Sequence, residues 1–389
     1  MITGMPVMRE RERVELSLVA GRVLAAPVVS PLDIPACPTS AMDGYALYSG
    51  DIASVPTTLN VAGTALAGHA YGAPLGPLSC VRIMTGAPLP AGADTVVMQE
   101  YAVRSDDTVT LSVKPHRDSH VRSTGEDIAV GEVLFAAGRR LSASDIARAA
   151  MLGISHLDVL RRLRVGFFST GDELAALSSA LKPGEVYDSN RYFLRAALEQ
   201  LNCVAVDLGR VADDPASIAS ALREARHAAD VIITTGGSSV GDKDYMQSVL
   251  ATRGTVGFSQ VAMKPGKPLS FGHFDGVPTV LLPGSPTAMM VAFYVVVRDA
   301  LVAAGGDNTP PKNAIRARLE GTLSATAGRN EYVQTTLYRR GGETVAAPLG
   351  RRLRDRANDR QVAHLDGFIE LDGSQTRIES GALVDVLAV

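Results

Sequence analysis

Apolar and polar positions follow different periods along this chain, and the changes of period divide it into parts. Residues 9–24 and 142–152 carry helical patterns, the second behind a serine that can cap a helix. Between them, short β-rich runs are separated by glycine and proline. We therefore expect a helical N-terminal domain made of residues 1–45 and 121–160, with a small β domain, residues 46–120, inserted into it. The inserted runs are residues 61–63, 70–72, 81–84 and 95–98.

From residue 161 the pattern changes to apolar strands that alternate with amphipathic helices. The predicted strands are residues 165–169, 204–206, 230–234 and 279–282, and the predicted helices are residues 190–201, 215–229 and a long one after Pro286. This alternation favours a central three-layer α/β/α domain, residues 161–306, with a mostly parallel sheet. After a Gly/Pro-rich linker, residues 307–389 return to short alternating runs. They predict a small C-terminal all-β domain.

Composition narrows the class of protein further. A chain of 389 residues is longer than a domain with a single hydrophobic core usually is, so several domains are expected. A net charge of −3 disfavours a protein held to nucleic-acid phosphates. The longest apolar run, residues 288–297, is about half the ~20 residues that a membrane span needs. The first 13 residues lack a signal-peptide core, and three separated cysteines indicate neither a disulfide framework nor a zinc ribbon. We expect a cytoplasmic protein with no membrane or nucleic-acid partner.

Unusual residues collect in the loops that follow the predicted strands of the α/β domain. Ligands of such sheets bind at the carboxyl ends of the strands, so these loops should meet on one rim. Gly236, Gly237 and Gly241 would let backbone N–H groups approach an anion, aided by the helix start after Pro283 and Gly284. The plain alternative is that the glycine-rich turn only makes room for packing.

The same rim is rich in carboxylates, namely Asp172, Glu173, Asp213, Asp214, Asp242 and Asp244. Such a cluster would repel a phosphate unless a hard cation joined the two, which indicates Mg²⁺. Asp213 and Asp214 could equally be helix caps, whereas a functional role is favoured for Glu173 and Asp244. Lys264 and Lys267 lie in a proline-flanked loop suited to present two ammonium groups to phosphate.

Other catalytic motifs have weaker support. Residues 237–241 match the G-x-S-x-G nucleophile elbow, but only His273 and His364 follow it, and no oxyanion segment of the HGGG type precedes it. The sequence contains no P-loop, no G-x-G-x-x-G and no H-E-x-x-H. The arginine-rich residues 350–356 are best interpreted as a solvated loop, because aspartates are interleaved with the arginines and aromatic residues are absent.

Seven ordered motifs together resemble the molybdopterin molybdenumtransferase family, which includes MoeA and the E domain of gephyrin. They are SAMDGYA (40–46), RIMTGA (82–87), RSTGED (122–127), TGDEL (170–174), GGSSVG (236–241), KPGKP (264–268) and LPGSP (282–286). The resemblance runs from near the N-terminus to about residue 335. It implies an elongated four-domain homodimer whose active site lies between subunits.

The resemblance also implies an activity: adenylylated molybdopterin and molybdate are converted to molybdenum cofactor, with release of AMP and assistance from Mg²⁺. It places functional residues at Asp43, Thr85, Arg122, Asp127, Glu173, Asp213, Asp244, Lys264, Pro283, Pro286 and Arg329. Lys264, Lys267, Arg329 and the loops with Ser238, Gly241 and Gly284 would bind the pterin nucleotide, and Glu173, Asp213 and Asp244 would hold Mg²⁺. Arg122 and Thr85 could receive molybdate.

Some positions depart from the family pattern. Gln260 stands where many members carry lysine, Pro38 stands where an aspartate is common, and residues 355–361 replace a Ser-Gly-rich loop. These departures leave open a catalytically weakened paralogue that acts as a molybdopterin-binding or scaffold protein. Molybdopterin adenylyltransferase, and molybdoenzymes or their chaperones, are the partners that the resemblance suggests.

Overall fold

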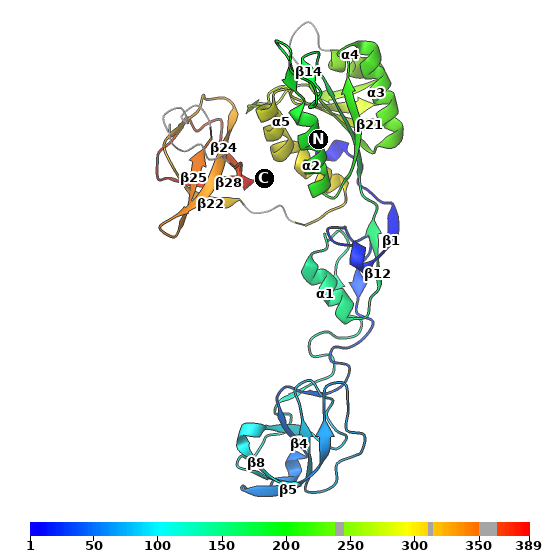
Figure 1. Ribbon diagram of the computed structural model, residues 1–389, viewed down its shortest axis with the longest axis vertical. Coiled ribbons are helices and arrows are strands. Elements are labelled where there is room, and N and C mark those ends of the chain that lie inside the picture. The colour runs from blue at the N-terminus through cyan, green and yellow to red at the C-terminus, as the bar shows by residue number, and fades with distance from the viewer. Residues whose placement is uncertain (238–244, 310–313, 350–363) are drawn as a thin grey trace.

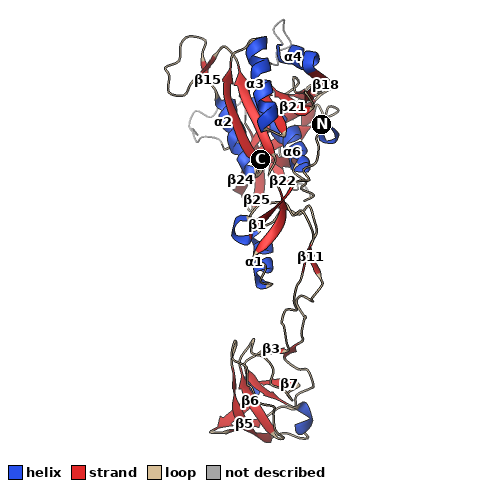
Figure 2. Cartoon of the chain, turned by 90° about the vertical axis from the view of Figure 1, so that its right-hand side faces the viewer, coloured by secondary structure: helices blue, strands red, loops and turns tan. Residues whose placement is uncertain are grey.

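The computed structural model describes residues 1–237, 245–309, 314–349 and 364–389. The molecule is elongated (Figure 1): the inserted β domain lies at one end, the small domain with helix α1 (Ala143–Met151) in the middle, and the α/β domain at the other end beside the C-terminal β domain. The chain reaches the insert and returns from it through two adjacent extended segments (Figure 2). The expected multidomain organisation is therefore present.

The α/β domain is built on a six-stranded sheet. Its spatial order is β16 (Val204–Val211), β13 (Arg164–Thr170), β17 (Val231–Thr235), β21 (Val277–Leu282), β20 (Ser270–Phe274) and β18 (Gly254–Phe258). The first four strands run parallel to one another, and β20 and β18 continue the sheet in antiparallel pairing. The four strands expected from the sequence are confirmed. The antiparallel extension was not predicted.

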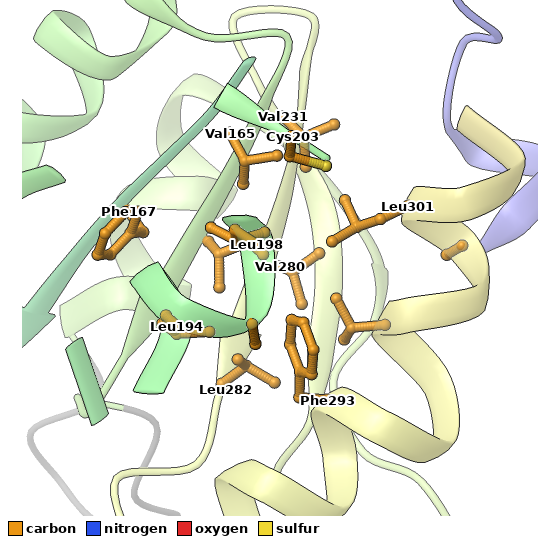
Figure 3. Close-up of a cluster of buried hydrophobic side chains, with 14 of the residues drawn as sticks. Val165, Phe167, Leu194, Leu198, Cys203, Val231, Val280, Leu282, Phe293 and Leu301 are labelled. Atoms are coloured by element: carbon orange, nitrogen blue, oxygen red, sulfur yellow. The ribbon is translucent and has the colours of Figure 1, made fainter. Parts of the chain in front are cut away.

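Helices cover both faces of this sheet. They are α2 (Ser189–Gln200), α3 (Pro215–Ala228), α4 (Tyr245–Arg253) and the continuous segment α5 (Pro286–Ala292), η5 (Phe293–Val297, a π-helix) and α6 (Arg298–Ala304). Consecutive residues of β13 point to opposite faces: Phe167 packs with Leu194 and Phe293 on one face (Figure 3), and Phe168 packs with Leu222 on the other. This alternation explains why the strand reads as an unbroken apolar run.

The helix at residues 286–304 is long and apolar enough for a membrane span by length and composition, with a mean hydropathy of 1.7. Half of its most apolar window is buried inside the protein. Met289, Phe293 and Leu301 belong to the sheet-facing core. Val291 and Tyr294 of the same helix pack with Phe368 of the C-terminal domain, so its apolar residues serve two contacts within the protein.

The middle domain corrects one sequence expectation. The predicted helix at residues 9–24 is wrong: the segment forms β1 (Arg11–Glu15) and a short 3₁₀ turn, Leu16–Leu18. Strand β1 pairs antiparallel with β12 (His156–Leu160), about 145 residues away along the chain. A partner so distant cannot be seen in a local pattern. The domain is thus mixed rather than helical, with α1 as the helix that was correctly predicted behind the Ser142 cap.

The inserted domain is a six-stranded sheet. Its order is β7 (Thr95–Met98), β4 (Gly44–Leu47), β6 (Ser79–Ile83), β5 (Thr57–Ala65), β9 (Thr108–Leu111) and β8 (Ala102–Ser105). The expected strand at 70–72 is wrong. Tyr71 instead packs over Gly63 of β5, where a Cβ would come within 2.6 Å of the tyrosine ring.

The C-terminal domain is a closed barrel-like sheet. Strands β24 (Asn330–Arg340), β25 (Glu343–Pro348), β22 (Ile315–Leu319), β28 (Leu383–Ala388) and β26 (Gly367–Leu371) form a ring, closed by the pairing of β26 with β24. The short strand β19 (Met263–Lys264) of the preceding domain pairs with the start of β24. The barrel is therefore joined to the α/β domain by main-chain hydrogen bonds.

Candidate active site

Three loops meet in van der Waals contact at the carboxyl ends of β13, β17 and β21. Gly236 follows β17 with φ of +90°, and a Cβ there would lie 1.9 Å from the carbonyl oxygen of Thr170 at the end of β13. A Cβ on Gly284, after β21, would lie 3.4 Å from the Cα of Gly236. At position 236 only glycine leaves room for the Thr170 carbonyl group, whereas the contact at Gly284 is of ordinary van der Waals length. The convergence on one rim predicted from the sequence is confirmed for these loops.

A hollow of about 360 Å³, open to solvent, lies at this rim. Thr170, Glu173, Gly236, Gly284 and Pro286 contribute to its wall, as does the start of α2. The surface of the hollow is thus made largely of backbone and short polar groups. Such a lining suits a polar ligand.

Asn190, in the first turn of α2, connects the loops. Its Nδ2 donates to Thr235 Oγ1 and to the carbonyl oxygen of Gly284, both at 2.8 Å, and Thr235 Oγ1 donates to Pro283 O at 3.1 Å. The side chain is buried, and its Oδ1 has no hydrogen-bond partner among the described residues. Asn190 also borders the hollow, so a buried acceptor without a partner in the described residues lies beside it.

Asp188, the N-cap of α2, is a second buried polar residue at the hollow. Its carboxylate accepts hydrogen bonds from Ser169 Oγ and from the backbone N–H of Arg191. Sequence reasoning missed both Asp188 and Asn190. The signal was present, since an Asp-Ser-Asn run directly before a helical pattern is typical of a capped helix start.

The two adjacent aspartates after β16 have different roles. Asp214 caps α3, accepting from the N–H groups of Ala216 and Ser217 at 3.0 Å, and hydrogen bonds from Ser217 hold its pKa below the ordinary value. Asp213 instead accepts from Thr170 Oγ1 at 3.2 Å, and its Oδ1 lies close to Gly237. Asp213 therefore faces the rim, and Asp214 is structural.

A second cluster lies at the base of the inserted domain. Asp43 Oδ1 accepts from both the backbone N–H and the Oγ1 of Thr85, each at 2.8 Å, and these bonds lower the pKa of Asp43. Arg122 forms ion pairs with Asp127 and Glu126, which raise its pKa. Two-residue strands β3 (Thr39–Ser40) and β10 (Val121–Arg122) pair beside these groups, so three motifs far apart in sequence converge.

A third group lies where the barrel meets the α/β domain. Lys264 Nζ is 3.2 Å from Glu331 Oε2, and Arg329 precedes β24 beside the same junction. Lys267 is exposed, and its carbonyl oxygen accepts from the N–H of Val261. None of these three cations borders the hollow at the rim.

The predicted residues Ser238, Gly241 and Asp244 lie outside the described residues. Within the described part of the chain, no three His, Cys, Asp or Glu residues cluster closely enough to hold a metal ion by themselves. Glu173 and Asp213 do lie on the same rim, Glu173 in the wall of the hollow and Asp213 beside Gly237. A magnesium site formed by these two with Asp244 therefore stays a prediction.

Comparison with known proteins adds independent information. Residues 2–153 match the family described as MoeA N-terminal region (domain I and II), and residues 166–303 match the one described as probable molybdopterin binding domain. A molybdopterin molybdenumtransferase of Haemophilus influenzae is 36% identical over 342 residues, covering 87% of this chain and 84% of its own length. This chain belongs to the molybdopterin molybdenumtransferase family.

Further relatives agree with this membership. Molybdopterin molybdenumtransferase 2 of Mycobacterium tuberculosis is 33% identical over 385 residues, covering 96% of this chain and 94% of its own length. The crystal structure of a molybdopterin biosynthesis MoeA protein from Pyrococcus horikoshii superposes with a TM-score of 0.82 at 28% identity, covering all of this chain and 96% of that one. The family fold thus extends over the whole chain, and the molybdenumtransferase identification made from the motifs is confirmed. The chain is an enzyme of molybdenum cofactor biosynthesis.

Proposed function

We propose that this molybdenumtransferase inserts molybdate into adenylylated molybdopterin and releases AMP. The observation that carries the proposal is the glycine-built rim at the ends of β13, β17 and β21, where a polar hollow lies against Glu173 and the unpaired oxygen of Asn190. The names of the relatives support the reaction class.

The rim provides for the pterin nucleotide. Backbone N–H groups of a glycine turn and of a helix start bind anionic oxygens. The α5 start at Pro286 leaves such N–H groups exposed beside Gly284. The Asn190 Oδ1 can accept from a ring N–H or amino group of the pterin, since Nδ2 is already used within the protein. In this proposal the backbone N–H groups bind the phosphate, and the Asn190 side chain binds the pterin ring.

Mg²⁺ fits the acidic part of this rim. Glu173 and Asp213, with Asp244, would hold the ion through carboxylate oxygens, its preferred donors. When bound, the ion would offset the negative charge of the phosphoanhydride. Thr170 keeps Asp213 oriented toward the rim by its hydrogen bond. Removal of either carboxylate should therefore weaken the dependence on Mg²⁺.

Molybdate is assigned to the cluster in the inserted domain. The Arg122 guanidinium is about one-third exposed, so it can donate to an oxyanion. Asp127 fixes its orientation. The Thr85 hydroxyl donates a hydrogen bond to Asp43, which favours the ionised carboxylate and holds the threonine oxygen in place. Together these residues orient the oxyanion site rather than change its protonation state.

The two clusters belong to domains at opposite ends of one chain, with the α1 domain between them (Figures 1 and 2). A single chain of this shape cannot bring both to one substrate. We infer that the inserted domain of one subunit meets the α/β domain of a second, so that the enzyme acts as a homodimer. Arg329 and Lys264, at the junction with the barrel, would bind the outer part of the nucleotide.

The test is a direct assay. Purified protein is incubated with adenylylated molybdopterin and Mg²⁺, and AMP is measured with and without molybdate. Molybdate-dependent release is expected. Tight pterin binding without such release would contradict the proposal and indicate a scaffold role. Because Gln260 is exposed, a Gln260→Lys variant in the same assay shows whether the missing positive charge limits the rate.

A further inference from the structure

An arginine-lined pocket lies at the edge of the α/β sheet opposite the candidate active site. Its wall includes Leu163, directly before β13, and Cys203, directly before β16, so it faces the amino ends of these strands. The pocket is open to solvent, and its space of about 370 Å³ includes part of that solvent. Among the residues that the structure describes, it is bordered by no carboxylate and by four arginines: Arg22, Arg140, Arg161 and Arg162.

Arg22 carries an unpaired donor in this place. Its side chain is 8% exposed, and its Nη2 donates to Glu12 and to the carbonyl oxygen of Leu160. The Nε of Arg22 is buried and has no hydrogen-bond partner among the residues that the structure describes. A buried charged donor without an acceptor is costly, so this N–H group calls for an acceptor.

Arg162 adds charge that the protein does not balance. It is exposed and forms no ion pair with any described residue, whereas its neighbour Arg161 is held by Glu10 and Asp230. The Arg161 contacts fix the backbone from which Arg162 projects. Arg161 therefore holds the backbone in place, and Arg162 provides a guanidinium group that no described carboxylate neutralises.

Arg140 completes the group from the α1 domain. Its Nε donates to Asp307 at 2.7 Å, and its Nη1 makes only long contacts, 3.3 and 3.4 Å, to the carbonyl oxygens of Leu201 and Gly21. Contacts of this length are weak and can give way to a better acceptor. The nearby Cys203 adds no negative charge, because burial raises the pKa of its thiol to about 12.

We infer that this pocket binds a tetrahedral oxyanion, inorganic phosphate or molybdate, through Arg22, Arg140 and Arg162. Guanidinium groups match such oxyanions in geometry and charge. Arg22 and Arg140 belong to the middle domain, and Arg162 to the segment that enters β13. A bound anion would therefore fasten the two domains to each other, apart from any role in the catalytic reaction.

Titration calorimetry with phosphate and, separately, with molybdate tests this inference. The proteins compared are the Arg122→Gln variant, in which the proposed molybdate site is removed, and two double variants that add Arg162→Gln or Arg223→Gln to it. Arg223 is an exposed arginine of α3 away from the pocket and serves as the matched control. Loss of charge-assisted hydrogen bonds predicts roughly tenfold to hundredfold weaker binding for Arg162→Gln. Binding to Arg223→Gln should be unchanged. The titration that shows binding identifies whether the ligand of the pocket is phosphate or molybdate.

Three readouts decide the outcome. Crystals soaked in molybdate should show an anomalous molybdenum peak between Arg22 and Arg162. Thermal unfolding without anion should be the same for Arg162→Gln and wild type, since Arg162 makes no ion pair with the described residues. AMP release by the single variant Arg162→Gln should also be unchanged, which separates this inference from the proposed reaction. Equal affinities in the two calorimetry variants, binding of neither anion, or a pocket without a peak would overturn the inference.

Discussion

Thr85 donates two hydrogen bonds to one oxygen of Asp43, from its backbone N–H and from its hydroxyl, each 2.8 Å long. The two residues lie 42 positions apart, in two motifs that sequence reasoning could place side by side only through a family resemblance. The two hydrogen bonds lower the pKa of the Asp43 carboxyl group, with a smaller contribution from the charge of Arg82. The carboxylate is therefore ionised at every pH at which the enzyme is expected to work.

Thr85→Val should raise the pKa of Asp43 toward its ordinary value. Because the folded-state pKa is lowered, the stabilising contribution is present at neutral pH and is lost as pH falls from about 4 through the lowered value. Carboxyl-carbon NMR titration measures the shift. Thr110→Val, which removes a hydroxyl contact with Thr58 elsewhere in the insert, should leave it unchanged. Identical titration of wild type and Thr85→Val would refute the assignment.

Gly236→Ala should abolish AMP release, because its Cβ would collide with Thr170 O at 1.9 Å. Gly276→Ala is the matched control, since Gly276 has a similar φ of +86° but nothing within 4 Å of the added carbon. The control should cost only the strain of a left-handed residue, about 1–2 kcal/mol, and keep full activity. Urea unfolding and the AMP assay measure both. Equal losses in the two variants would show that contact at the rim is unimportant.

Thr234→Val and Thr235→Val should differ in their effect on stability. Thr234 Oγ1 is buried with no hydrogen-bond partner in the described part of the chain, so its replacement by a methyl group should be neutral or stabilising. Thr235 Oγ1 binds Asn190 and Pro283, so its loss should lower the free energy of unfolding by about 1–3 kcal/mol. Midpoints of urea denaturation give the comparison. The interpretation fails if Thr234→Val is the more damaging change.

Lys264→Gln and Glu331→Gln should separate binding from stability. The ion pair between them is exposed on the lysine side, so either change should alter the free energy of unfolding by less than about 1 kcal/mol. If Lys264 binds the substrate phosphate, Lys264→Gln should raise KM at least tenfold, whereas Glu331→Gln should leave KM unchanged or lower it by releasing the ammonium group. Steady-state AMP release supplies both constants. A raised KM in both variants would indicate that the pair acts only through structure.

Arg122→Gln and Glu173→Gln should complement each other when mixed. If the site lies between subunits, a heterodimer contains one intact site, and full exchange should restore roughly a quarter of the wild-type activity. Each variant alone should be inactive. An unchanged, inactive mixture after proven subunit exchange would place both residues in the same site of one chain.

The sequence was most informative where the structure is local. Strands such as β13 and β17 and the capped helices α1 and α3 were predicted because apolar runs, serine or aspartate caps and Pro215 act over a few residues. The rim itself could be predicted because the carboxyl ends of parallel strands must meet at one edge.

The failures have a common physical cause, which is pairing at a distance. The segment 11–15 is a strand because β12 is its partner, and β18 and β20 join the sheet as antiparallel strands that no βα alternation indicates. Asn190 was missed as a site residue because a helix-start asparagine is common. Its role is evident only from its hydrogen bonds to Thr235 and Gly284, which are 45 and 94 residues away along the chain.

The connection to the inserted domain has a mechanical consequence. Its two passes are joined by the short pairings of β2 (Val28–Val29) with β11 (Val133–Phe135), Ile34 with Ile128, and β3 with β10, and by single hydrogen bonds between them such as that from Val130 N–H to Asp33. At one end of this ribbon Val28 and Phe135 pack in the core of the middle domain. The part beyond them is only two strands wide, so it should bend more readily than the domains at its two ends. The orientation of the inserted domain in the working enzyme is therefore set by the surface that this domain contacts.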